Sequence, residues 1–178
     1  GMPVYGLPES FKVLGQGSIG IIPISMIIMV IVFIIGYIIL NKMVFGRKIY
    51  GIGGNAETAR LSGVNVKKEI YKIYMLVGFF GSLAGLILMS RVNSGQPSAG
   101  DGYEMDAIAA TALGGTSMSG GRGKIQGTLI GVLIIGLISN GLNLMHVNSY
   151  WQFVLKGIII IAAVYVDMVK QKKQNAAK

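Results

Sequence analysis

The chain contains no cysteine, and only 13% of its 178 residues are charged. The missing cysteines exclude a disulfide framework, a thiolate nucleophile and a cysteine-ligated metal. An average soluble domain has about a quarter of its residues charged, whereas this chain is 52% hydrophobic. A soluble core of this size could not bury so much apolar surface. The composition therefore excludes water-soluble classes and indicates an integral membrane protein.

The hydrophobic residues are gathered in blocks, as expected where lipid is the solvent. No charge interrupts Ile21 to Leu40, and at about 1.5 Å per residue a helix of that length covers roughly 30 Å of hydrocarbon. The segment 106–118 is too short to cross as a straight helix, so we expect a short helix buried among the others and continued by a loop. We predict an all-α polytopic protein with about five transmembrane or partly spanning helices, at 21–44, 73–91, 106–118, 125–142 and 151–169.

The formal net charge of +9 follows from the positions of the lysines and arginines. They are concentrated in 45–72, between 106–118 and 125–142, and in 170–178. The positive-inside rule puts the loop 45–72 and the tail 170–178 in the cytoplasm and the N-terminal loop 1–20 outside. Lys156, inside the last segment, is expected to snorkel to water near Trp151. Topology explains the charge, so we expect a lipid bilayer and no nucleic acid as partner.

The loop 45–72 is the most informative stretch of the sequence. Gly51 to Gly54 predicts a flexible turn, Asn55 a helix cap, and 56–62 a short helix that Gly63 ends. A short amphipathic helix on the cytoplasmic face can dock in the groove of a partner protein. The alternative is an interfacial helix that lies on lipid headgroups through its basic residues.

Two glycine-rich stretches do not satisfy the requirements of nucleotide sites. The first, 51–56, follows a membrane helix instead of a strand in a βαβ unit. The second, 114–124, has Met118 where a P-loop needs glycine and is followed by Ile125 where magnesium needs Ser or Thr. We expect no nucleotide, catalytic or metal site on this chain, and therefore no enzyme.

Four stretches carry a resemblance to a known family: FGRKIYGIGGNAETARLSGVNV, GYEMDAIAATALGGTSMSGGRGKIQGTLIGVLI, NGLNL and SYWQFVLKGIIIIAAVYVD. In this order they resemble the membrane subunits of bacterial ribose, galactoside and xylose ATP-binding-cassette (ABC) importers. The resemblance covers nearly the whole chain and implies the C-terminal half, 1–178, of a permease with ten membrane helices. It also implies the bacterial inner membrane and a monosaccharide cargo, with ribose the first choice and galactose or methylgalactoside, xylose and arabinose still open.

The resemblance further implies partners and residue roles. The partners are a cytoplasmic ATP-binding subunit that carries ATP and Mg, an extracytoplasmic sugar-binding protein and a second permease copy. The ATPase-coupling loop would contain Gly54, Asn55, Glu57, Ala59, Arg60, Leu61 and Gly63. The residues Tyr103, Glu104 and Asp106, which precede the short helix, would lie at the outer mouth or contact the binding protein, and Thr116, Ser117 and Ser119 would line the path. For Asp106 the helix dipole alone is an alternative explanation.

Two patterns of small residues, Gly81-x-x-x-Gly85 and Gly127-x-x-x-Gly131, permit close helix approach. We expect them to pack within the subunit and not to form a dedicated dimer face. Two other functions stay open. An ATP-independent, ion-coupled sugar carrier would need ionisable residues near the bilayer midplane, where these segments have none. A non-transporting membrane fragment or scaffold is the other alternative.

Overall fold

The computed structural model describes residues 1–176, which are almost entirely helical. In chain order the elements are β1 (Val4–Tyr5), α1 (Glu9–Gln16), β2 (Ser18–Ile19), β3 (Ile22–Pro23), α2 (Ile24–Tyr37), the π-helix η1 (Ile38–Lys42), α3 (Val44–Gly54), α4 (Ala56–Leu61), α5 (Val66–Val92), β4 (Ser94–Gly95), α6 (Tyr103–Leu113), α7 (Ile125–Leu144) and α8 (Ser149–Ala176). The strands form two small antiparallel pairs, β1 with β4 and β2 with β3. The predicted all-α class is confirmed.

Four helical stretches are long and apolar enough to cross a membrane in the described part of the chain. They are Ile24–Lys42, Val66–Val92, Ile125–Leu144 and Ser149–Val169. By contrast, α6 has 11 residues, about 16 Å of helix, which is too short to cross alone. It ends at Gly114, as expected from the glycine pair there, and continues as a loop. The chain is a multi-pass membrane protein.

Several boundaries differ from the sequence-based expectations. The stretch 1–20 contains the helix α1, which packs on α5 and is bonded to it: the Ser90 hydroxyl donates to the Phe11 carbonyl at 2.6 Å and accepts from the Gly15 N–H at 2.8 Å. The helix α5 begins at Val66 and not at residue 73, because Asn65 caps it. The last helix continues to Ala176 through most of the predicted tail, and Lys178 lies outside the described residues.

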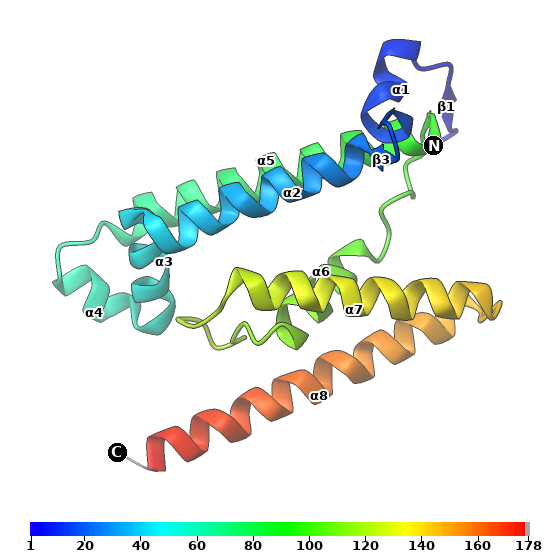
Figure 1. Cartoon of the computed structure of the whole chain (residues 1–178). Helices are drawn as coiled ribbons and strands as arrows, with labels where there is room; N and C mark the ends of the chain where they lie inside the picture. The colour runs from blue at the N-terminus through cyan, green and yellow to red at the C-terminus, as the bar shows by residue number, and fades with distance from the viewer. Residues whose placement is uncertain (177–178) are drawn as a thin grey trace.

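The helices divide between two groups (Figure 1). The helix α6 packs against both α7 and α8, whereas α1 packs on α5 and α2. The helices α3 and α4 and the loop between α6 and α7 lie at one end of the molecule, and the N-terminus, α1 and the turn from α7 to α8 lie at the other. The basic stretches therefore share one end, as the charge pattern predicts for one side of a membrane.

The buried core is small and lies between α6, α7 and α8. Ala109 and Ala110 of α6 are buried against Ile135 of α7, with Ile159 and Ile160 of α8 packed beside them. Most other large apolar side chains of the long helices are exposed. Such exposure is expected where lipid or further helices, and not water, cover the surface.

Candidate functional site

The short helix α4 is held at both ends by local bonds. The Asn55 side-chain oxygen accepts a hydrogen bond of 2.9 Å from the Thr58 N–H, which satisfies one of the open donors of the first turn. At the other end the Ser62 hydroxyl donates to the Thr58 carbonyl at 2.9 Å. Gly63 follows with φ of +84°, a conformation that strains residues with a Cβ. The predicted cap, helix and stop are all present.

The helix α4 turns a small residue inward and its large and charged residues outward. Ala59 is buried, whereas Glu57 and Arg60 are exposed and Leu61 is 82% exposed. A groove of about 850 Å³ lies between α4 and the start of α5, and its lining includes Glu57, Arg60 and Lys67. An exposed leucine beside opposite charges can give a protein partner an apolar anchor and a charge register.

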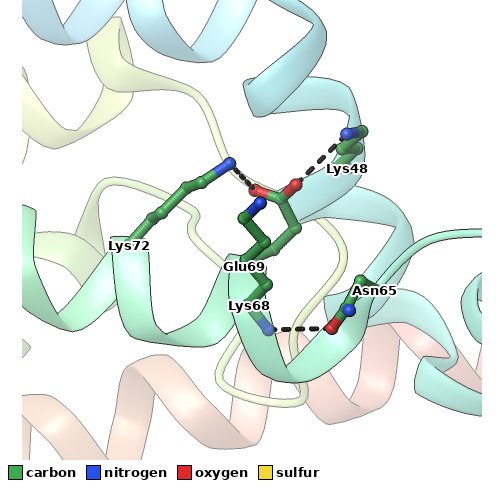
Figure 2. A network of polar contacts seen from close by, with 5 residues as sticks. All are labelled: Lys48, Asn65, Lys68, Glu69 and Lys72. Atoms are coloured by element: carbon green, nitrogen blue, oxygen red, sulfur yellow. Dashed lines mark hydrogen bonds and ion pairs between the residues drawn. The ribbon is translucent and has the colours of Figure 1, made fainter.

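A buried carboxylate ties α3 to α5, the helices that flank α4. Figure 2 shows Glu69 of α5 between Lys48 of α3 and Lys72 of α5, with each lysine Nζ 3.1 Å from a different carboxylate oxygen. The Glu69 side chain is only 5% exposed. A carboxylate so far from water is stable only with such compensation. Removal of Lys48 would weaken the attachment of α3 to the long helix α5, whereas Lys72 compensates Glu69 within α5 itself.

The two glycine-rich stretches of the sequence meet at this same end. A Cβ at Gly53 would lie 2.6 Å from the Gly121 nitrogen, and a Cβ at Gly120 would lie 2.5 Å from the Gly53 carbonyl oxygen. The Tyr50 hydroxyl also donates to the Gly123 carbonyl at 3.1 Å. We call Gly53, Gly54, Gly120 and Gly121 the glycine clasp. The predicted flexible turn at 51–54 is wrong, because residues 51–54 belong to the helix α3. Gly53 and Gly54 have no side chain, which permits backbone-to-backbone contact with the loop after α6.

The residues expected to line a path, Thr116, Ser117 and Ser119, lie in that loop. The Ser117 hydroxyl donates to Asp167 Oδ2 of α8 at 2.8 Å, and Ser117 is buried. Thr116 is half-buried, and its side chain is what a Cβ at Gly123 would touch, at 3.0 Å. Ser119 is exposed and its N–H donates to the Ser117 hydroxyl at 3.3 Å. Ser117 thus joins the loop to α8, and path lining stays a prediction for all three.

The residues Tyr103, Glu104 and Asp106 form the first turn of α6 and do not precede it. The helix starts there because Gly102, with φ of +87°, reverses the chain just before it. Asp106 points to α8, where Lys156 Nζ lies 2.6 Å from Asp106 Oδ1. The Lys156 side chain is 12% exposed, so it ends at Asp106 and does not extend to water as expected. The dipole of α6 is therefore not the only partner of Asp106.

Sequence reasoning missed Glu69, the Asp106–Lys156 pair and the glycine clasp. For two of these three features the sequence contained a signal that could have identified them. Glu69 and Lys72 stand three residues apart, a spacing that brings opposite charges together on a helix. A single lysine inside an apolar run requires an acidic partner, and Asp106 was a candidate. The glycine clasp had no such signal, because glycine spacing does not identify which backbone comes close.

The sequence model of the family described as "Branched-chain amino acid transport system / permease component" matches residues 3–164. The chain belongs to this permease family. The ribose import permease protein RbsC of Bacillus subtilis (strain 168) is 52% identical over 172 residues, which are 96% of this chain and 53% of that protein. No solved structure matches the chain.

Two further relatives from Escherichia coli (strain K12) belong with it. The ribose import permease protein RbsC is 49% identical over 175 residues, which are 96% of this chain and 54% of that protein. The xylose transport system permease protein XylH is 40% identical over 152 residues, which are 85% of this chain and 39% of that protein. The chain thus spans about half the length of the ribose permeases that it matches.

Proposed function

We propose that the chain is part of the membrane-spanning permease of an ABC importer that moves a monosaccharide, ribose first, across the bacterial cytoplasmic membrane. The observation that carries the proposal is α4: a short helix, capped at both ends, that exposes Arg60 and Leu61 and is flanked by α3 and α5, which the Lys48–Glu69 ion pair joins. The names of the 52% and 49% identical relatives support ribose as cargo.

In this proposal α4 is the element that a cytoplasmic ATP-binding subunit holds. A partner can move a membrane helix only through a rigid contact. The Lys48–Glu69 ion pair connects α3, on one side of α4, with α5, on the other. The glycine clasp extends that connection to the loop before α7. ATP and Mg would bind on the partner subunit, and a sugar-binding protein and a second permease copy would complete the importer.

The charge pattern supports an orientation with α3, α4 and the end of α8 in the cytoplasm and α1 outside. The basic stretches lie at one end of the molecule and the N-terminus at the other (Figure 1). Reaction of biotin-maleimide with a cysteine placed at exposed Leu61 tests this orientation, since the chain has no other cysteine. Labelling in intact cells would contradict it.

Copurification of the ATP-binding subunit with the importer that contains this chain tests the coupling role. We expect Arg60→Ala combined with Leu61→Ala to lower the recovered ATP-binding subunit at least tenfold, because the charge register and the apolar anchor are lost together. Lys42→Ala is the matched control: Lys42 is exposed and basic and lies in η1, outside α4. Equal recovery with the double variant and the control would remove α4 from the contact.

A second function is favoured by one observation, the Asp106–Lys156 ion pair between α6 and α8. Ionisable groups among membrane helices are a feature of ion-coupled carriers. Sugar uptake by vesicles distinguishes the two: an ABC importer requires ATP and continues when a protonophore removes the proton gradient. Uptake that stops with the protonophore and needs no ATP would establish the carrier instead.

A further inference from the structure

A pocket of about 650 Å³ lies among the helices α6, α7 and α8, away from α4. Its lining includes polar side chains from each of the three helices: Asp106 from α6, Ser139 and Asn140 from α7, and Gln152 and Lys156 from α8. The remaining wall is formed largely by small or apolar residues of α6 and α7. Ligand pockets of small molecules have volumes of about 300–1,000 Å³ and combine an apolar wall with a few convergent polar groups.

The polar side chains of the pocket lie within about two turns of an end of the helices that carry them. Lys156 is about two turns, roughly 10 Å, from the start of α8. Asn140 is about one turn from the end of α7, which joins α8 through a short turn. Polar groups at such depth are costly in lipid unless they serve a ligand or one another. The turn from α7 to α8, near which these residues stand, lies at the end of the molecule that carries the N-terminus (Figure 1).

The charges of the pocket favour a neutral ligand. Asp106 and Lys156 are paired with each other at 2.6 Å, so together they offer hydrogen-bond donors and acceptors without a net charge. Arg91, from the last turn of α5, also lines the pocket and adds a positive charge, but its side chain is exposed, and water and salt screen an exposed charge. A binding site for a metal ion or an organic anion would instead present unpaired charge of one sign toward the ligand.

The remaining polar groups are fixed or unsatisfied, as in a prepared site. The Gln152 side-chain amide donates to Asn143 Oδ1 at 2.9 Å and to the Val147 carbonyl at 3.0 Å, which holds Gln152 in place. The Ser139 hydroxyl is buried and has no hydrogen-bond partner in the described part of the chain. A buried hydroxyl without a partner is unfavourable, and a ligand that bears hydroxyl groups would satisfy it.

We infer that this pocket is a binding site for a neutral monosaccharide inside the permease, with Ser139, Asn140 and the Asp106–Lys156 pair as its hydrogen-bonding groups. The inference rests on the proposed function and deepens it, since it names the groups that contact the sugar after release from the binding protein. Adjacent hydroxyls of a monosaccharide both donate and accept, as these groups do.

The absence of cysteine allows a direct test of occupancy. Asn140→Cys is introduced into the assembled importer, and the rate of its reaction with a small methanethiosulfonate is followed on this chain by mass spectrometry. We expect saturating ribose to slow the reaction at least threefold, and ribonate, a sugar acid, to leave it unchanged. Gln126→Cys is the matched control, because Gln126 is an exposed amide on the same helix outside the pocket; ribose should not alter its rate.

A transport measurement separates this inference from the proposed function. Ser139→Ala removes one oxygen and adds no volume, so the importer should assemble with its ATP-binding subunit as before, while ATP-driven ribose uptake falls at least threefold. Unchanged labelling at residue 140 and unchanged uptake, with a wild-type importer that takes up ribose, would overturn the pocket and leave the proposed function standing. Protection by ribonate and not by ribose would overturn the neutral ligand. A wild-type importer that takes up no monosaccharide would overturn both.

Discussion

The same spacing of glycines occurs in two helices of this chain with opposite surroundings. Gly127 and Gly131 of α7 touch the backbone of α6, where a Cβ at Gly131 would overlap the Ala110 carbonyl oxygen. A Cβ at Gly81 or Gly85 of α5 would meet nothing within 4 Å. The Gly-x-x-x-Gly pattern therefore permits another segment to come close to the helix but does not determine whether one lies there. The expected packing within the subunit is present for α7. In the described part of the chain nothing packs on the α5 glycines, so for α5 the expectation stays a prediction.

This difference in surroundings distinguishes α6, α7 and α8, which share a buried core, from α5, which takes no part in that core. The helices α6, α7 and α8 share the buried cluster around Ala109, Ala110 and Ile135. Beyond its contacts with α1 and its ion pair to α3, α5 leaves Val77 and Phe79 exposed, each by 62%. In lipid, apolar exposure costs little, so small residues and polar contacts decide which helices associate. The comparison predicts which glycines tolerate a methyl group.

The largest effect is expected at the tight crossing of α6 and α7. Gly131→Ala should lower the unfolding free energy by about 3 kcal/mol, the upper part of the range for overpacking, because the added methyl meets backbone and not a flexible side chain. Thermal unfolding of the purified chain in detergent, followed by circular dichroism, measures the change.

Gly136→Ala on the same helix is the matched control for Gly131→Ala. Nothing lies within 4 Å of a Cβ at Gly136, so alanine there should be neutral or stabilise α7 by about 0.5–1 kcal/mol through helix propensity. Equal melting temperatures for the two variants would mean that α6 and α7 are not in backbone contact at Gly131.

An intermediate effect is expected at the glycine clasp, which is a close contact between a helix end and a loop. Gly53→Ala should cost about 1 kcal/mol net, since overpacking of about 2 kcal/mol is partly offset by a gain in helix propensity. Gly51→Ala on the same helix meets nothing within 4 Å and should be stabilising. Thermal unfolding of the two variants measures the difference, and a stabilising Gly53→Ala would contradict the clasp.

The membrane class and the α4 region could be predicted from sequence because their signals are local. Uninterrupted apolar stretches mark the long helices, Asn55 accepts from an N–H three residues later, and Gly63 has the positive φ expected at a helix end. The start of α5 was placed seven residues late, because Lys67, Lys68 and Lys72 suggested a loop. Asn65 caps a helix on which Lys67 and Lys68 are exposed and Lys72 is paired with Glu69.

The contacts between distant segments could not be predicted in the same way. Tyr50 bonds to Gly123, Ser117 to Asp167 and Lys48 to Glu69, and each pair depends on how separate helices pack. The short helix α6 illustrates the limit: its length and its glycine end were expected, but the direction of Asp106 toward Lys156 depends on where α8 lies. Polar residues in apolar segments therefore need a structure before their partners are known.

The smallest effect per substituted residue, and the one that sharpens the comparison most, is expected on α5. Gly81→Ala with Gly85→Ala should stabilise the isolated chain slightly, by about 0.5–1 kcal/mol per site, because both positions are open. In the assembled importer the same double variant should reduce the recovery of intact complex if another helix covers this face, since each methyl would then push backbones apart. Thermal unfolding of the chain alone and size-exclusion chromatography of the importer measure the two effects. Full recovery of the complex would mean that the α5 glycines face lipid in the importer, whereas the α7 glycines pack against the backbone of another segment.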